Sequence, residues 1–276
     1  MDLIFFDLDG TLLNRQSELS IYTRETLTLL RENGIAYTVA TGRTMQSAQR
    51  LISGHFFDLP NIYNNGVTVW NPRDNALRLS NLLSSSEVSF ILESARERGL
   101  APFVNTVTTG AGQHQHVVFH GQARHAIEKE LIHAYFSRHD LSLVASLKIP
   151  ATSSVTNISM IGEKDTIKQV YDIMIQAPGL IAYSGPAVEG DRYSWIDIHH
   201  ERANKGSAVA SLKNELGATN VICFGDSDND ISMFKLADEC YAPENARDDI
   251  KQIASEVIGH HDEDGVARFL RARFGL

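Results

Sequence analysis

Near its start the chain reads Leu3-Ile4-Phe5-Phe6-Asp7-Leu8-Asp9-Gly10-Thr11, in which four apolar residues precede two carboxylates and a glycine. The apolar run is typical of a strand that is buried on both faces, as in a parallel sheet. A charge in the middle of such a strand would be strongly destabilising, because a buried, unpaired carboxylate loses its hydration. At the carboxyl end of the strand, however, side chains project into the crevice where open α/β sheets bind ligands. Two carboxylates placed there need a cation or a shared proton, so this stretch predicts chemistry as well as a fold.

Length and composition limit the class of protein. A chain of 276 residues exceeds the usual size of a single hydrophobic core, which predicts two domains. The formal net charge of −9 argues against a nucleic-acid partner, whose phosphates would be repelled. Cys223 and Cys240 lie in apolar surroundings and are typical of buried thiols in a reducing compartment. Because we find neither a signal peptide nor an apolar run of membrane-spanning length, we expect a cytoplasmic protein without a membrane partner.

The first part of the chain alternates between strands and helices. After the acidic turn the pattern predicts a helix over residues 21–33 and a second buried strand over residues 35–40. Over residues 82–186 the order of elements changes to that of a separate α+β domain. This segment is too long to be a loop, so we interpret it as an inserted domain.

Strict alternation returns after the insertion. Strands are expected over residues 195–198 and 221–224, with a helix over residues 205–216 between them. The sequence therefore predicts a doubly wound, Rossmann-like parallel-sheet core made of residues 1–81 and 187–276, into which the α+β domain is inserted.

Polar residues follow three of the predicted buried strands at the point where each strand ends. Asp7 and Asp9 follow the first strand, Thr41 follows the second, and a run rich in aspartate follows the strand over residues 221–224. Strands of one parallel sheet point the same way, so we expect these groups to converge on one crevice.

These residues form four motifs that resemble those of haloacid-dehalogenase-superfamily phosphatases. The layout is similar to the Cof-like subgroup, in which a cap domain is inserted between the second and third motifs. Three shorter stretches also resemble that subgroup: Asn64-Asn65-Gly66, Asn245-Ala246 and Asp264-Gly265-Val266-Ala267. The four main motifs are Asp7-Leu8-Asp9-Gly10-Thr11-Leu12, Thr41-Gly42-Arg43, Asn204-Lys205-Gly206 and Gly225-Asp226-Ser227-Asp228-Asn229-Asp230.

The resemblance implies a catalytic pair. Asp7 would be the nucleophile that attacks phosphorus to give an aspartyl-phosphate, which divides one difficult displacement into two easier ones. Asp9 would be the general acid for the leaving alkoxide, and then the general base for the water that hydrolyses the intermediate.

The resemblance also implies a phosphate-binding set. Its members are expected to be Leu8, Thr41, Gly42, Lys205 and Asn229. A short hydroxyl and a glycine backbone can approach phosphoryl oxygens closely. Lys205 would supply a point positive charge, which the start of its helix reinforces.

A metal ion follows both from the resemblance and from charge. Asp7, Asp9 and Asp226 are the expected ligands, and Asp230 would orient metal-bound water. Carboxylates and a phosphate dianion repel one another unless a cation is present. All candidate ligands carry oxygen, which favours Mg²⁺ over Zn²⁺. Arg43 is expected to pair with the acidic groups or to begin its helix, without a catalytic role.

The sequence therefore predicts Mg²⁺-dependent hydrolysis of a small phosphorylated metabolite, such as a sugar phosphate or a phosphorylated cofactor, by a monomer or weak homo-oligomer. The cap would close over the crevice and select the leaving group. One alternative is a phosphomutase of the same superfamily, which would need a cationic cluster in the cap for a second phosphate. Another is a non-catalytic protein that binds a phosphorylated ligand on the same scaffold. We disfavour it because Asp7, Asp9, Lys205 and Asp226 are all present.

Overall fold

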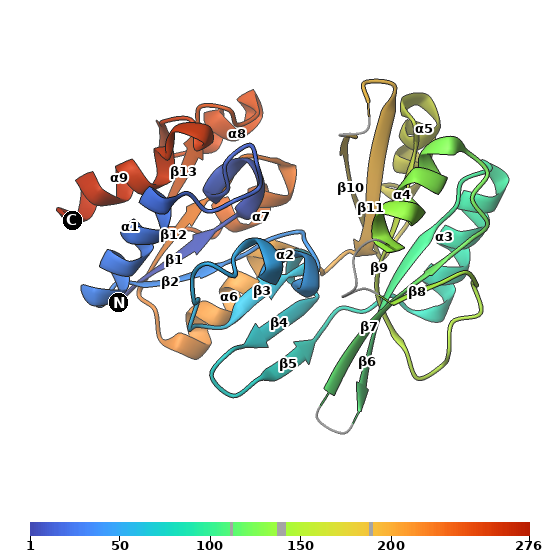
Figure 1. The fold of residues 1–276 in the computed structure, drawn as a ribbon, viewed down its shortest axis with the longest axis horizontal. Coiled ribbons are helices and arrows are strands. Elements are labelled where there is room, and N and C mark those ends of the chain that lie inside the picture. The colour runs from blue at the N-terminus through green and yellow to red at the C-terminus, as the bar shows by residue number, and fades with distance from the viewer. Residues whose placement is uncertain (111–112, 137–141, 188–189) are drawn as a thin grey trace. The chain divides into compact units, whose positions relative to one another are not determined.

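The computed structural model describes residues 1–110, 113–136, 142–187 and 190–276. The chain forms two compact units (Figure 1). The first combines Met1–Ser80 with Asn204–Leu276, and the second is Asn81–Ala203. In the part of the chain that is described, no helix is long and apolar enough to cross a membrane.

The first unit is built on a parallel sheet. Its strands lie in the order β14-β13-β12-β1-β2, and each neighbouring pair is parallel. The predicted doubly wound core is confirmed, because the chain runs outward from β1 in one direction and from β12 in the other. The strands are β1 (Asp2–Phe6), β2 (Ala36–Val39), β12 (Asn220–Phe224), β13 (Glu239–Pro243) and β14 (Glu256–Ile258).

Helices cover both faces of this sheet because successive residues of each strand point to opposite sides. In β1, Ile4 and Phe6 pack in the cluster that contains α1 (Ile21–Glu32), α2 (Met45–Leu51) and α9 (Gly265–Phe274). Leu3 and Phe5 pack in the cluster that contains α6 (Lys205–Leu216), α7 (Ile231–Phe234) and α8 (Asp248–Ile253). Burial on both sides explains the continuous apolar run that precedes Asp7.

A small antiparallel sheet follows α2. It consists of β3 (Asn61–Tyr63), β4 (Thr68–Asn71) and β5 (Ala76–Leu79). The turn between β3 and β4 holds Asn64 and Asn65 at positive φ, of 48° and 50°. Asparagine tolerates this left-handed conformation better than most residues.

The second unit is an α+β domain with a mainly antiparallel sheet in the order β10-β11-β9-β6-β7-β8. The edge pair β7–β8 is parallel. Its strands and helices, in chain order, are α3 (Ser85–Glu97), β6 (Phe103–Gly110), β7 (Gln113–His120), α4 (Ala126–Phe136), β8 (Ser142–Val144), β9 (Ser154–Glu163), α5 (Lys164–Met174), β10 (Leu180–Pro186) and β11 (Tyr193–His200).

The boundary at which the chain returns to the first unit differs from the prediction. We expected the return at residue 187 and a core strand over residues 195–198. The structure places these residues in β11, antiparallel to β9 and β10, and the first unit resumes at Asn204. Buried Ile196 and Ile198 alternate with Trp195 and Asp197, and this period of two is typical of an antiparallel strand that has one apolar face.

Candidate active site

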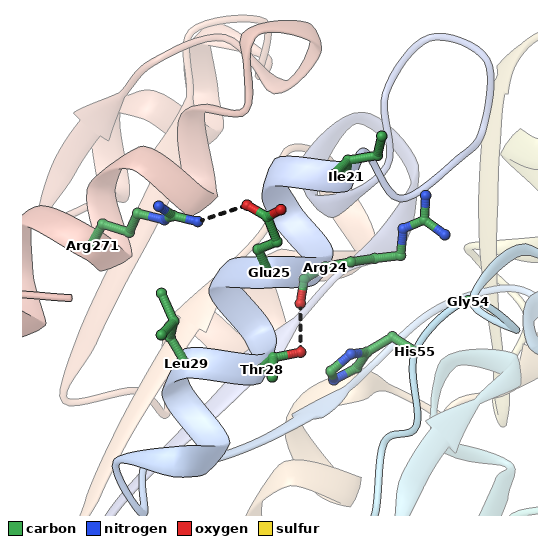
Figure 2. Close-up of a pocket in the computed structure, with 8 residues that line it drawn as sticks. All are labelled: Ile21, Arg24, Glu25, Thr28, Leu29, Gly54, His55 and Arg271. Carbon is green, nitrogen blue, oxygen red and sulfur yellow. Dashed lines mark hydrogen bonds and ion pairs between the residues drawn. The ribbon is translucent and has the colours of Figure 1, made fainter.

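A hollow of about 490 Å³ lies on the first unit, beside α1 (Figure 2). Two charged groups that line it are paired with each other, because Arg271 contacts Glu25, and Arg271 also donates a hydrogen bond to Thr26. His55, which also lines it, contacts the Tyr37 hydroxyl, and burial lowers the pKa of His55 to about 4. None of the predicted catalytic residues lines this hollow, so the candidate site lies elsewhere.

The candidate site is at the carboxyl edge of the parallel sheet, between β1 and β12. These strands are neighbours, with Phe6 paired to Phe224, and the strand order reverses between them. Such a reversal is where open α/β sheets bind ligands. Asp7 directly follows β1, and Asp226 lies just beyond β12.

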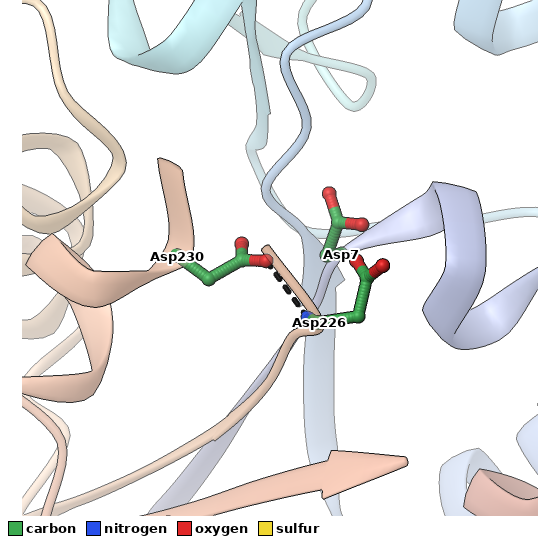
Figure 3. Close-up of side chains that lie close together, drawn as sticks. All are labelled: Asp7, Asp226 and Asp230. Carbon is green, nitrogen blue, oxygen red and sulfur yellow. Dashed lines mark hydrogen bonds between the residues drawn. The ribbon is translucent and has the colours of Figure 1, made fainter. Parts of the chain in front are cut away.

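Three carboxylates converge at this edge. Asp7, Asp226 and Asp230 each offer an oxygen atom, and these atoms lie within 4.8 Å of one another. Figure 3 shows the three side chains close together at this edge. The structure therefore brings Asp7 and Asp226 together as predicted, and it adds Asp230, which the sequence assigns only a supporting role.

Lys205 lies at the centre of the buried part of the site. Its Nζ is 2.5 Å from Oδ1 of Asp7 and 2.6 Å from Oδ1 of Asp230, and its side chain is fully buried. Lys205 begins α6, whose preceding residue Asn204 accepts a hydrogen bond from the Ser207 N–H and so caps the helix. The ammonium therefore joins residues that are 198 and 25 positions away along the chain.

Asp230 shapes the loop that carries Asp226. Its Oδ2 accepts hydrogen bonds from the backbone N–H groups of Asp226, at 2.9 Å, and Ser227, at 3.0 Å. With Lys205 on its other oxygen, Asp230 is engaged on both sides. This arrangement supports a positioning role rather than direct metal ligation.

The electrostatics of the cluster fit a cation. Burial raises the pKa of the Asp7 carboxyl well above its usual value, which Lys205 opposes and Asp230 reinforces. Burial and the Asp230 carboxylate raise the pKa of Asp226 to about 7. A divalent cation between Asp7 and Asp226 would relieve the same repulsion, and the oxygen-only donor set suits Mg²⁺.

Asp9 lies outside the buried cluster and pairs with Arg43. The guanidinium donates from Nε to Oδ2 of Asp9, at 2.5 Å, and from Nη2 to Oδ1, at 2.6 Å. Nη1 of Arg43 also donates to Ser47, at 3.1 Å. Both carboxylate oxygens of Asp9 are thus held by one planar fork. Its participation in metal binding stays a prediction.

The turn that carries Asp9 depends on a glycine. Gly10 has a φ of 71°, a conformation that L side chains rarely adopt. A Cβ at this position would lie 2.4 Å from Oδ2 of Asp226. The motif therefore needs glycine here both for the turn and for the close approach of the Asp226 side chain.

Two residues of the predicted phosphate-binding set, Thr41 and Asn229, lie beside Gly42. A Cβ on Gly42 would lie 3.2 Å from Oδ1 of Asn65 and 3.3 Å from Nδ2 of Asn229. These two side chains are joined directly, since Asn229 donates to Asn65 at 3.0 Å. Thr41 is buried, and its hydroxyl accepts a hydrogen bond from the Arg43 N–H at 3.1 Å. The Asn65–Asn229 contact joins two motifs that lie far apart in the sequence.

The side chain of Leu8 points into the core of the first unit and not toward the predicted phosphate site. Its side chain is fully buried in the hydrophobic cluster beneath the turn, with Phe6 and Leu12. A phosphate contact by Leu8 can therefore involve only its N–H or its carbonyl group.

The second unit contains a buried polar network that the sequence did not reveal. Asn157 donates to Asp197 at 2.6 Å, and Asp197 contacts Nε2 of His199 at 2.8 Å. Thr156 in turn donates to Asn157 at 2.8 Å. The only signal was the pair Asp197 and His199, two residues apart in β11, and Asp197 fell in the strand over residues 195–198 that we expected in the core.

Comparison with known proteins places these features in a family. The profile of haloacid dehalogenase-like hydrolases matches residues 4–270. The chain is 25% identical over 281 residues to a 5-amino-6-(5-phospho-D-ribitylamino)uracil phosphatase of Bacillus subtilis (strain 168), covering 99% of this chain and 98% of the relative. It is 29% identical over 276 residues to an HMP-PP phosphatase of Enterobacter sp. (strain 638), covering 97% and 94%.

A solved structure has the same fold. The haloacid dehalogenase-like hydrolase from B. subtilis superposes with a TM-score of 0.79 at 23% identity, covering 98% of this chain and 99% of that one. Three features of the chain agree with this class of hydrolase. They are the doubly wound sheet, the aspartate cluster where the strand order reverses, and the inserted α+β unit. The chain belongs to the haloacid dehalogenase-like hydrolases, and the resemblance seen in its four motifs is confirmed.

Proposed function

We propose that the protein is a Mg²⁺-dependent phosphatase that hydrolyses small phosphorylated metabolites through an aspartyl-phosphate on Asp7. The observation that carries the proposal is the position of Asp7. It follows the strand at the reversal point of the sheet, it contacts Lys205 at 2.5 Å, and it shares a cluster with Asp226.

In the first step a carboxylate oxygen of Asp7 would attack phosphorus while the bond from phosphorus to the leaving oxygen breaks. Asp9 would donate a proton to that oxygen. Lys205, the Gly42 backbone and Asn229 would stabilise negative charge on the phosphoryl group. Asp7 and Asp226 would hold Mg²⁺, which supplies further charge neutralisation when bound.

In the second step Asp9 would take a proton from a water molecule that attacks phosphorus, and the bond to Asp7 would break. Asp9 must leave Arg43, at least in part, to face the leaving group and then the water. Its side chain is 49% exposed, so solvent can replace the guanidinium contacts.

Small metabolites are supported as substrates by the two relatives, whose names specify a phosphorylated ribitylaminouracil and HMP-PP. We propose that the second unit selects among such substrates. Its own hydrophobic core and its insertion between the Thr41 and Lys205 motifs support this role.

The test is a phosphate-release assay on a panel of sugar phosphates, phosphorylated cofactors and a generic aryl phosphate. We expect turnover with Mg²⁺, loss of turnover with a chelator and recovery when Mg²⁺ is returned. Asp7→Asn should abolish turnover and remove acid-stable labelling of the protein by radioactive substrate. The matched control is Asp58→Asn, whose carboxylate pairs with Arg73 on the surface.

Four results would contradict the proposal. Turnover by Asp7→Asn would mean that water or another residue attacks phosphorus. Indifference to the chelator would remove the metal. A rearranged sugar phosphate in place of free phosphate would indicate a mutase, and binding without any turnover would indicate a non-catalytic protein.

A further inference from the structure

Asn245 links the turn after β1 to the C-terminal part of the first unit. Its Nδ2 donates a hydrogen bond to the carbonyl oxygen of Gly10 at 2.7 Å. Gly10 is the residue after Asp9, and Asn245 lies two residues beyond β13, which is separated from β1 in the sheet by β12. The contact therefore passes across the end of the strand that carries Asp226.

The same short segment also holds the Asp226 loop. The backbone N–H of Arg247 donates to the carbonyl oxygen of Asp226 at 3.1 Å. Between the two anchors, Gly10 and Asp226 are packed so closely that a single added carbon would clash at 2.4 Å. Residues 245–247 thus hold both loops that supply the carboxylates of the proposed metal site.

The amide of Asn245 is itself held in one orientation. Its Oδ1 accepts a hydrogen bond from the backbone N–H of His261 at 3.1 Å, so its Nδ2 must face Gly10. The His261 side chain adds a second link to the turn, since its Nδ1 contacts the carbonyl oxygen of Leu13 at 2.7 Å. Three loops at the carboxyl edge of the sheet therefore meet at Asn245.

We propose that Asn245 is a positioning residue that sets the spacing between the Asp7 and Asp226 carboxylates and thereby the affinity for the metal ion. This inference rests on the metal site of the proposed function. Mg²⁺ requires nearly ideal geometry with oxygen ligands at about 2.0–2.1 Å, so small shifts of either loop weaken its binding. Removing an outer partner of a metal site typically costs about 10- to 100-fold in affinity or activity.

The experiment measures binding of Mg²⁺ alone to the full chain by calorimetry. Asn245→Ala should weaken Mg²⁺ binding by about 10-fold. The increase in melting temperature on adding Mg²⁺ should shrink accordingly, because ligand stabilisation depends on the ratio of ligand concentration to Kd. Turnover should fall at limiting Mg²⁺ and largely recover at saturating Mg²⁺.

Asn33→Ala is the matched control. Asn33 also donates from its side-chain amide to a backbone carbonyl, that of Leu29 at 2.9 Å, but it lies at the end of α1 that precedes β2, at the opposite edge of the sheet. It should bind Mg²⁺ as the unaltered protein does. If Asn245→Ala does not fold, Asn245→Ser provides the same measurement with a smaller loss of volume.

Unaltered Mg²⁺ affinity in a folded Asn245 variant would overturn the inference, even if the variant melts at a lower temperature. A turnover defect that saturating Mg²⁺ does not relieve would overturn it as well. Failure of the proposed function is distinguishable, because it appears as turnover by Asp7→Asn or as a missing reaction in the unaltered protein, whereas the binding measurement needs no reaction.

Discussion

Two ion-pair clusters of the first unit differ in their contact with water. Lys205 and its partners Asp7 and Asp230 have side-chain exposures of 0%, 7% and 0%. Arg43 and Asp9 have exposures of 29% and 49%. The first cluster, which we call the dry cluster, is buried and joins three chain segments, whereas the second is a solvent-exposed pair.

The difference matches the two proposed roles. A nucleophile must be held in one place relative to phosphorus. Asp7 is held in this way because it is buried and contacts the Lys205 ammonium, which Asp230 also contacts. A general acid that also serves as general base must face two different groups in turn, which an exposed pair allows. Exposed ion pairs contribute little to stability, so Asp9 can exchange partners at low cost.

The strongest test of the dry cluster is Lys205→Met. Removing the ammonium leaves Asp7 and Asp230 buried without their cation, and losing one partner of a buried ion pair costs about 3–5 kcal/mol of stability. We expect a large drop in the free energy of unfolding, measured by urea denaturation, together with loss of phosphatase activity. The control is Lys213→Met in the same helix, whose amine is 3.3 Å from Asp238 near the surface. Equal stability of the two variants would mean that Lys205 is not an internal anchor.

Asp9→Asn should separate activity from stability. Removing the acid and base function is expected to lower kcat by about 10²- to 10⁴-fold. The melting temperature should hardly change, because the side chain is half exposed and its ion pair is solvated. Rapid-quench measurements should show slower formation and slower breakdown of the phosphorylated protein. Unchanged rates would remove Asp9 from proton transfer.

Arg43→Lys should have a smaller effect. Lysine keeps the charge but loses the planar fork that holds both oxygens of Asp9, so the carboxylate becomes less well oriented. We expect kcat to fall several-fold with little change in KM, and Arg43→Ala to fall further. A defect as large as that of Asp9→Asn would instead indicate that Arg43 contacts the substrate.

Arg78→Ala removes an exposed ion pair away from the site and should have the smallest effect of these variants. Arg78 pairs with Glu215 at 2.7 Å, and both side chains are largely exposed and belong to none of the four motifs. We expect no measurable change in kcat, in KM or in the urea midpoint, because such pairs are screened by water and salt. A clear effect would show that surface pairs of this unit matter more than their exposure implies.

The sequence predicted the parts of the site whose position follows from strand direction. Asp7, Thr41 and Asp226 each follow a buried strand of one parallel sheet, so their convergence required no knowledge of packing. It offered Arg43 as a partner of the acidic groups but did not specify Asp9, because the bidentate contact depends on where the turn after β1 and the loop before α2 come to lie. The hydrogen bond from Asn245 to Gly10 could not be predicted from the sequence either, although the motif that contains Asn245 was recognised.

The point at which the chain returns from the second unit to the first could not be predicted for a similar reason. The run Trp195-Ile196-Asp197-Ile198 is short, and its alternation can be mistaken for a buried strand when the neighbouring strands are unknown. In the structure this run pairs with β9 and β10, and that pairing places it in the second unit.

By itself, then, the amino-acid order determined which segments become strands, where each strand must end and which charged groups stand at those ends, since hydrophobic burial and the cost of buried charge act locally. Tertiary structure alone decided which carboxylate is fixed by Lys205, which is held by Arg43, and how Asn245 joins the loops. These pairings join residues far apart in the chain, and they exist only once the packed sheet brings the loops within hydrogen-bonding distance.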